Sequence, residues 1–272
     1  MRRWQLDVPW PPAGRYTFYD LSFPIRTGMP HAPGLPGTHF GLVKQHGDVA
    51  LDAGVSTAAE ALSIGGHTGS HVDGWAHVSR EGFVFGGHDI LSAQSMVEGV
   101  RVAAVDEMPP MIGEGHLVDL ALLLGREARP DDAVGATELE RWFAGRRQPG
   151  PGSIVLLRTG WGAHWGDAER YVGAATGFPG LVIEGARWLA ERGIAVWGVD
   201  TLAGEKQPDR GLPVHVHLLV ERGIPILEML HLETLAQDRV YEFFFIAAAL
   251  PIAGGTGSPL RPLAAVPERA PG

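Results

Sequence analysis

Apolar runs separated by turn-forming residues recur along the chain and predict a series of short strands. The runs are rich in Val, Ile, Leu and Phe, and Gly, Pro or Asp residues lie at or near their ends. Several lack a strict alternation of apolar and polar residues, which is typical of strands buried on both faces of a sheet. The predicted strands span residues 17–23, 116–124, 153–158, 194–200, 224–230 and 239–250.

Helical patterns alternate with some of these strands. The sequence from Thr137 to Glu140 has the form of a capping box, which predicts a helix from Thr137 to about Arg147. Residues 184–192 are amphipathic and precede a glycine, a residue that readily ends a helix. Residues 212–222 repeat this arrangement, with a proline in the first turn and a glycine after the last.

The order of these elements predicts an α/β fold for residues 1–272, as a single domain with a mixed sheet and flanking helices. The N-terminal third is expected to be irregular, as is the Gly- and Pro-rich tail from Gly254 onward. The run Phe243–Phe245 alternates poorly. It is expected to be a strand that is buried on both faces or that a partner subunit covers.

The composition excludes several classes of protein. The chain has 38 glycines and 21 prolines, but a hydrophobic fraction of 45% argues against disorder. Its 22 basic and 31 acidic residues give a net charge of −9, without the cationic surface that nucleic acid binding needs. The longest apolar run, residues 243–253, is too short to suggest a membrane span, so no membrane partner is expected.

The chain contains no cysteine, and no apolar segment of a secretory signal follows Met1. Both features favour a cytoplasmic location, since disulfides belong to oxidising compartments. They also limit the chemistry of a metal site. Any ion would be held by His, Asp and Glu side chains, and the chain has 12 histidines.

Residues 65–77 concentrate potential metal ligands in a glycine-rich segment. His67, His71, Asp73 and His77 lie within 11 residues. On a straight strand His67 and His71 would be about 13 Å apart, too far to share an ion whose nitrogen ligands lie ~2.1 Å away. On a helix each of the four glycines would cost about 1 kcal/mol. A tight loop that brings His67, His71 and Asp73 around one ion, with a position left for water, is therefore favoured.

A Gly-rich turn can also carry exposed polar residues without any function. The density of ligand types in residues 65–77 favours metal binding, and histidine with carboxylate suits Zn²⁺ or Mn²⁺. Glu228 lies within an apolar run, where an unpaired carboxylate costs several kcal/mol, so a metal or a cation is expected beside it. Trp75 and Trp161 are candidates for an aromatic substrate pocket, although tryptophan is also common in cores.

Residues 67–77 resemble the H-x-G-T-H-x-D-x-P-x-H signature of the metal-dependent cyclase family, which includes bacterial kynurenine formamidase and isatin hydrolase. The resemblance extends along most of the chain. Further matching segments are Leu157–Trp161, Gly198–Thr201, His215–Glu228 and Gly255–Pro259. Two positions depart from the signature: Ser70 replaces a threonine, and Gly74-Trp75 replaces x-Pro, which places an indole beside the site.

The resemblance implies roles for individual residues. His67, His71 and Asp73 correspond to metal ligands and His77 to the catalytic acid/base. Glu228 and one histidine of the pair His215 and His217 correspond to ligands of a second metal, so one or two ions are expected. Neither histidine has the spacing of the family to Glu228. We take His217 as the ligand and place His215 in the substrate pocket.

The resemblance also implies a swivelling β/β/α fold, a homodimer or homotetramer, and a hydrolase. The expected reaction is cleavage of an amide-type C–N bond in an aryl formamide or in a cyclic amide such as an isatin. A cyclase, dehydratase or lactone hydrolase acting on a polyketide-like or aromatic substrate is the alternative. A non-enzymatic metal-binding module is a third reading, but it leaves His77 without a role. A serine hydrolase is disfavoured because the chain has no G-x-S-x-G motif.

Overall fold

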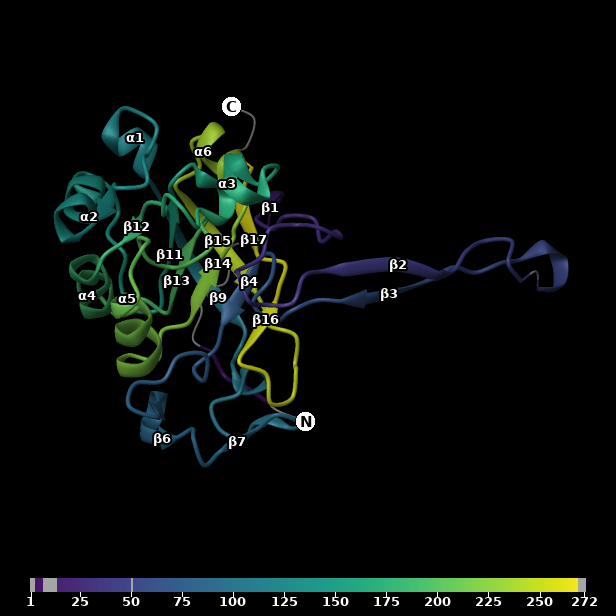
Figure 1. The fold of residues 1–272 in the computed structure, drawn as a ribbon. Helices are drawn as coiled ribbons and strands as arrows, with labels where there is room; N and C mark the ends of the chain where they lie inside the picture. The colour runs from purple at the N-terminus through teal and green to yellow at the C-terminus, as the bar shows by residue number, and fades with distance from the viewer. Residues whose placement is uncertain (1–2, 7–13, 50, 269–272) are drawn as a thin grey trace.

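The computed structural model describes residues 3–6, 14–49 and 51–268, so part of the N-terminal segment and the last four residues of the tail lie outside the described residues. A nine-stranded mixed sheet with the order β1-β17-β15-β9-β11-β13-β14-β4-β16 forms its centre (Figure 1). The strands are β1 (Tyr16–Asp20), β4 (His71–Asp73), β9 (Met111–Asp119), β11 (Ile154–Arg158), β13 (Val196–Val199), β14 (Ile226–Glu228), β15 (Glu242–Ala247), β16 (Gly257–Pro259) and β17 (Leu263–Pro267).

The four central strands β9, β11, β13 and β14 are parallel, and the strands on either side of them are antiparallel to their neighbours. Each of the six predicted apolar runs overlaps one strand of this sheet, although β1 begins one residue and β9 five residues before the predicted start. The run over residues 116–124 needs a correction, because the strand ends at Asp119. The Asp119 side chain accepts a hydrogen bond from the backbone of Leu122 and so caps the short helix that follows.

Four two-stranded pairs lie outside the large sheet. Two of them belong to the N-terminal third, which is therefore less irregular than the sequence predicts. The pairs are β2 (His39–Lys44) with β3 (Ala59–Ser63), β5 (Phe83–Val84) with β6 (His88–Asp89), β7 (Gln94–Ser95) with β8 (Gly99–Val100), and β10 (Ala133–Val134) with β12 (Gly180–Leu181).

The helices are short, and α1, α2, α4 and α5 lie together on one side of the sheet (Figure 1). Among the described residues, none is long and apolar enough to cross a lipid bilayer. The α-helices are α1 (Leu120–Leu124), α2 (Ala136–Phe143), α3 (Ala168–Val172), α4 (Ile183–Glu191), α5 (Pro213–His215) and α6 (Glu233–Gln237). A π-helical turn (Val216–Glu221) continues α5, and 3₁₀ turns occur at Asp52–Gly54, Phe85–Gly87, Val105–Glu107 and Trp161–His164.

Two predicted helices differ in detail from the observed ones. The helix predicted from Thr137 begins at Ala136, because the capping pair is Gly135 and Glu138: the Gly135 N–H donates to the Glu138 carboxylate at 2.9 Å. The helix predicted over residues 212–222 is confirmed only in part, since its second half is π-helical. The third, α4, ends as predicted before Gly193, which has a φ of +71°.

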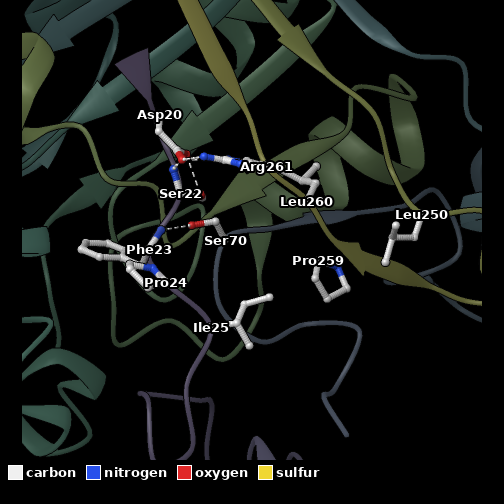
Figure 2. A pocket seen from close by; sticks show the side chains of 10 residues that line it. All are labelled: Asp20, Ser22, Phe23, Pro24, Ile25, Ser70, Leu250, Pro259, Leu260 and Arg261. Atoms are coloured by element: carbon white, nitrogen blue, oxygen red, sulfur yellow. Dashed lines mark hydrogen bonds and ion pairs between the residues drawn. The ribbon is translucent and has the colours of Figure 1, made fainter. Parts of the chain in front are cut away.

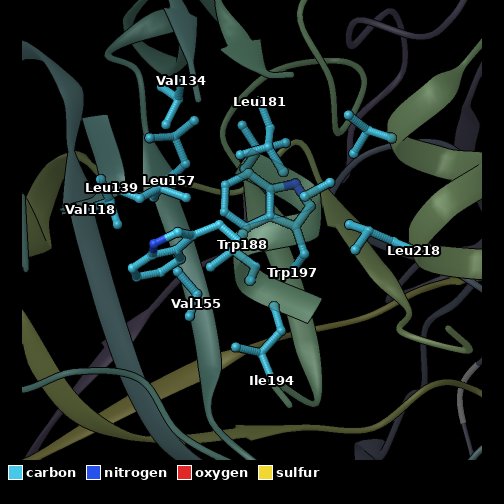
Figure 3. Close-up of a cluster of buried hydrophobic side chains, with 14 of the residues drawn as sticks. Val118, Val134, Leu139, Val155, Leu157, Leu181, Trp188, Ile194, Trp197 and Leu218 are labelled. Atoms are coloured by element: carbon cyan, nitrogen blue, oxygen red, sulfur yellow. The ribbon is translucent and has the colours of Figure 1, made fainter. Parts of the chain in front are cut away.

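Apolar side chains cover both faces of the parallel strands. On the helical side Trp188 and Trp197 pack with Val155, Leu157 and their neighbours (Figure 3). On the other side residues such as Leu156 pack against β15, whose residues alternate between buried and partly buried positions. The central strands are therefore buried on both faces, as their apolar runs predict.

The β2–β3 hairpin projects away from the rest of the molecule as an arm (Figure 1). Phe40 and Leu62 are directly opposite each other across the hairpin, and their exposed fractions are 53% and 48%. Leu42 and Val43 are 57% and 70% exposed. Phe40, Leu42 and Leu62 share one face of the arm, and Val43 lies at an irregularity in the strand pairing between Leu42 and Lys44. The end of β3 leads directly into the glycine-rich segment at residues 65–77.

Candidate metal centre

The glycine-rich segment bends before it enters β4. Gly69 has a φ of +70°, a conformation that L side chains rarely adopt, and β4 begins two residues later at His71. The bend brings the ring centroids of His67 and His71 to 5.4 Å from each other. The tight turn that the spacing predicts is therefore present.

Strand pairing brings Glu228 to this segment. In the antiparallel pair of β4 and β14, Glu228 lies directly opposite His71. His71 Nε2 is 3.4 Å from Glu228 Oε2 and 3.3 Å from Asp73 Oδ1. His215 Nε2 is 3.2 Å from Glu228 Oε1 and 3.4 Å from Asp73 Oδ2. Ligands ~2.1 Å from a tetrahedral ion are about 3.4 Å from one another, so these spacings are those of a metal coordination shell.

Two buried polar atoms in this cluster, His71 Nε2 and Asp73 Oδ2, have no hydrogen-bond partner in the protein. Buried polar atoms are rarely left in this condition unless a water or an ion completes them. The other nitrogen of His71, Nδ1, lies 2.8 Å from the Gly69 carbonyl oxygen and donates to it, so Nε2 is the atom that faces the carboxylates. The donor set and its orphaned atoms fit a divalent ion.

A second group shares Asp73 with the first. His67 Nδ1 is 2.6 Å from Asp73 Oδ1, and His77 Nε2 is 3.7 Å from Asp73 Oδ2. The rings of His67 and His77 stack with centroids 3.9 Å apart. His71, Asp73, Glu228 and His215 are buried, whereas the His77 side chain is 31% exposed. His77 is thus the residue of the cluster with the most access to solvent.

The mutual interactions of these residues shift their pKa values in opposite directions. Burial alone would lower the pKa of His71, but the carboxylates of Asp73 and Glu228 raise it to about 10. The pKa of His215 is raised for the same reasons. Burial would raise the pKa of Asp73, but the imidazoles around it, His77 above all, hold it well below its usual value. Burial dominates at His77 and lowers its pKa.

His217 does not belong to this cluster. Its Nδ1 donates to Glu221 Oε2 at 2.7 Å, on the π-helical turn, and its ring is directed by that bond. His215, two residues earlier, faces Asp73 and Glu228. The structure therefore brings His215, and not His217, beside Asp73 and Glu228, and the assignment of a ligand among the two stays a proposal.

The two tryptophans of the predicted pocket have other contacts. The Trp75 indole N–H donates to the Gly223 carbonyl at 2.8 Å, and its ring lines an apolar pocket beside Met108. Trp161 is buried in an aromatic cluster, where its indole N–H donates to the Tyr171 carbonyl at 2.9 Å. Their contribution to substrate binding stays a prediction.

Three supporting residues were not assigned roles from the sequence. Thr256 Oγ1 is 2.9 Å from His67 Nε2. Gly257 packs against the His67 ring so closely that a Cβ atom would collide with it. Glu205 bonds to His215. Thr256 and Gly257 are distant in sequence from residues 65–77, and a loop separates Glu205 from His215. The resemblance of Gly255–Pro259 to the cyclase family is the one sequence signal that includes any of these three residues.

A pocket of about 470 Å³ lies beside β4, and its wall includes Ser70, Phe23 and Pro259 (Figure 2). Ser70 Oγ accepts a hydrogen bond from the Phe23 N–H at 3.1 Å. The ion pair of Asp20 and Arg261 lines one side of this pocket. A second pocket, of about 380 Å³, has a mainly apolar lining of small residues.

Comparison with known proteins places the chain among cyclases. A solved structure described as a novel cyclase superposes with a TM-score of 0.83 and 25% identity, over 91% of this chain and 86% of that one. An isatin hydrolase of Roseibium aggregatum is 27% identical over 215 residues, which cover 76% of this chain and 74% of the relative. A kynurenine formamidase of Bacillus thuringiensis is 28% identical over 204 residues, which cover 74% and 76%.

The family model described as "Putative cyclase" matches residues 19–206. This match spans the arm, the glycine-rich segment and the parallel strands β9, β11 and β13, which is more than half of the sequence. The chain therefore belongs to the cyclase family.

Proposed function

We propose that the protein is a metal-dependent hydrolase that uses water to cleave an amide-type C–N bond in a small aromatic substrate. The observation that carries the proposal is the pair of unpartnered buried atoms, His71 Nε2 and Asp73 Oδ2, within a shell of His, Asp and Glu ligands. The names of the relatives, isatin hydrolase and kynurenine formamidase, supply the bond type.

The ion that this shell suits is Zn²⁺ or Mn²⁺, because its donors are imidazole nitrogens and carboxylate oxygens. His71, Asp73 and Glu228 would hold one ion, with His215 beside the same two carboxylates. His67, Asp73 and His77 form a second group that could hold an ion, although we assign His77 to proton transfer. A bound ion of this type lowers the pKa of a water molecule toward ~7 and polarises a carbonyl group.

His77 would act as the general base and acid. Its lowered pKa keeps the ring neutral at neutral pH, so one ring nitrogen can accept a proton from the attacking water. The water oxygen forms the new bond to the carbonyl carbon as the C–N bond breaks. The His77 ring then returns the proton to the leaving nitrogen, which gives an acid and an amine.

The pocket of about 380 Å³ is a candidate for the aromatic part of the substrate. Its wall includes Leu202 and Ala203, which directly precede Gly204, and the Gly204 N–H holds Glu228 at 2.6 Å. Its size and apolar lining suit a small ring system rather than a polymer.

Replacement of His77 by alanine is predicted to lower kcat by about 10²- to 10⁴-fold, the usual contribution of general acid/base catalysis, while bound metal is retained. Steady-state kinetics and metal analysis of the same sample measure both quantities. His88→Ala, at an exposed histidine outside the cluster, should leave kcat unchanged. Loss of the metal together with activity would instead make His77 a ligand.

Metal binding is predicted to release protons at pH 7. In the metal-free protein, His71 is protonated at this pH because its pKa is raised to about 10, and the pKa of His215 is raised as well, whereas a metal binds only the neutral imidazole. Calorimetric titration with Zn²⁺ in buffers of different ionisation enthalpy should show release of at least one proton, that of His71. Affinity should weaken as the pH falls. A binding heat that does not depend on the buffer would contradict this assignment.

The alternative function is ring closure, dehydration or lactone opening, as the family name suggests. These reactions require the same metal and base, so the substrate decides between them. A panel of N-formyl anilines, isatins and aromatic lactones, assayed with Zn²⁺ or Mn²⁺, distinguishes the two. Turnover of the first two classes supports the C–N hydrolase, and turnover of lactones alone favours the alternative.

We further propose that the protein is a homodimer or homotetramer in which the β2–β3 arm packs on a second copy of the chain. An isolated two-stranded hairpin has little stability in water, and this one exposes several large apolar residues. Contact with a partner would bury these residues. It would also fix the segment that leads from β3 into the metal cluster.

Simultaneous replacement of Leu42 and Val43 by serine is predicted to convert the assembly to monomers, because it removes two exposed apolar side chains from the arm. Light scattering coupled to size-exclusion chromatography measures the mass. Leu91→Ser, at an exposed leucine outside the arm, is the matched control and should leave the mass unchanged. An oligomer that persists in the double variant would exclude the arm as the interface.

A further inference from the structure

Glu205 is a buried carboxylate with no role in the reaction described above. It is 1% exposed and lies in the loop after β13. Its Oε1 is 2.5 Å from His215 Nδ1, and its Oε2 accepts a hydrogen bond from the Val214 N–H at 2.9 Å. Both oxygens are therefore engaged by neighbouring residues of α5. Burial of a carboxylate is unfavourable unless its charge is paired in this way.

Several hydrogen bonds fix the position of the backbone around Glu205. The Trp197 indole N–H donates to the Gly204 carbonyl at 2.9 Å, and the Lys206 N–H donates to the Leu181 carbonyl at 2.9 Å. The absence of a side chain at Gly180 permits this approach, since a Cβ atom there would lie 2.6 Å from the Lys206 nitrogen. Because the Gly204 N–H also bonds to Glu228, one short segment supports two members of the cluster.

These contacts determine which nitrogen of His215 faces the cluster. The Val214 N–H is a fixed donor, so one carboxylate oxygen must accept from it, and the other accepts from Nδ1–H of His215. The remaining nitrogen, Nε2, then points to Glu228 and Asp73. We infer that Glu205 is a positioning residue that holds the His215 ring so that Nε2 is presented to a divalent ion. The inference rests on the proposed function.

A second pair of the same chemistry provides the matched control. Glu221 accepts from His217 Nδ1 at 2.7 Å, but its side chain is 42% exposed and also pairs with Arg80. Among the described ion pairs, His215 contacts Asp73 and Glu228, whereas neither His217 nor Glu221 contacts either of these two carboxylates. Removal of this second carboxylate should therefore have no effect on the metal.

The test is Glu205→Gln. Glutamine has one acceptor oxygen, which the Val214 N–H requires, so its NH₂ group would face Nδ1–H of His215 and two donors would oppose each other. The ring must turn, or its proton must move to Nε2, and either change removes the ligand atom. The Zn²⁺ dissociation constant, measured by competition with a chelator, is expected to rise about 10- to 100-fold. Glu221→Gln should leave it unchanged.

Two further measurements test the role of Glu205. In zinc-loaded protein labelled with ¹⁵N-histidine, the Nδ1–H resonance of His215 should be present in the wild type and lost in Glu205→Gln. Glu205→Asp retains the charge but is one methylene too short to reach both partners, so its affinity for Zn²⁺ should also fall. This variant provides the test if circular dichroism shows that the glutamine variant is unfolded.

The results of these experiments distinguish a failure of the role proposed for Glu205 from a failure of the proposed hydrolase function. Folded Gln and Asp variants with the wild-type zinc affinity and an unchanged Nδ1–H resonance would overturn the role of Glu205 and leave the hydrolase intact. A wild-type chain that binds no Zn²⁺ and no Mn²⁺ would overturn both.

Discussion

The carboxylate of Asp73 is the group on which the rest of the site depends. It is fully buried, and the side chains of His67, His71, His77 and His215 all lie against it. An isolated carboxylate in this position would cost several kcal/mol, so these imidazoles and a bound cation are needed to compensate for its burial. Because Asp73 belongs to both ligand groups, it links the more exposed His77 to the inner shell around Glu228.

The sheet brings these groups together from distant parts of the sequence. Antiparallel pairing of β4 with β14 sets His71 opposite Glu228, and pairing of β16 with β4 brings the segment around Thr256 beside His67. The parallel strands of the same sheet, which include β14, are buried on both faces and hold β4 and β16 in a fixed position. A site built on strands and fastened loops holds its ligands at fixed distances, as metal coordination requires.

The sequence predicts the parts of this arrangement that depend on nearby residues. The apolar runs identify the strands, and the spacing of His67, His71 and Asp73 among glycines predicts the bend that brings them together. It does not distinguish His215 from His217, because residues two apart lie on roughly opposite sides of a helix and the sequence does not show which side faces β4 and β14. The strands β16 and β17 in the Gly- and Pro-rich tail were also missed, since their pairing with β4 and β1 is a long-range contact.

The measurement that tests the account most directly is the metal content and hydrolytic activity of Asp73→Ala, compared with the wild-type protein. The wild type is expected to bind Zn²⁺ or Mn²⁺ and to hydrolyse an aryl formamide or an isatin. The variant, which lacks the carboxylate common to both ligand groups, is expected to lose the metal and the activity together. Stoichiometric metal and full activity in a folded Asp73→Ala protein would contradict it.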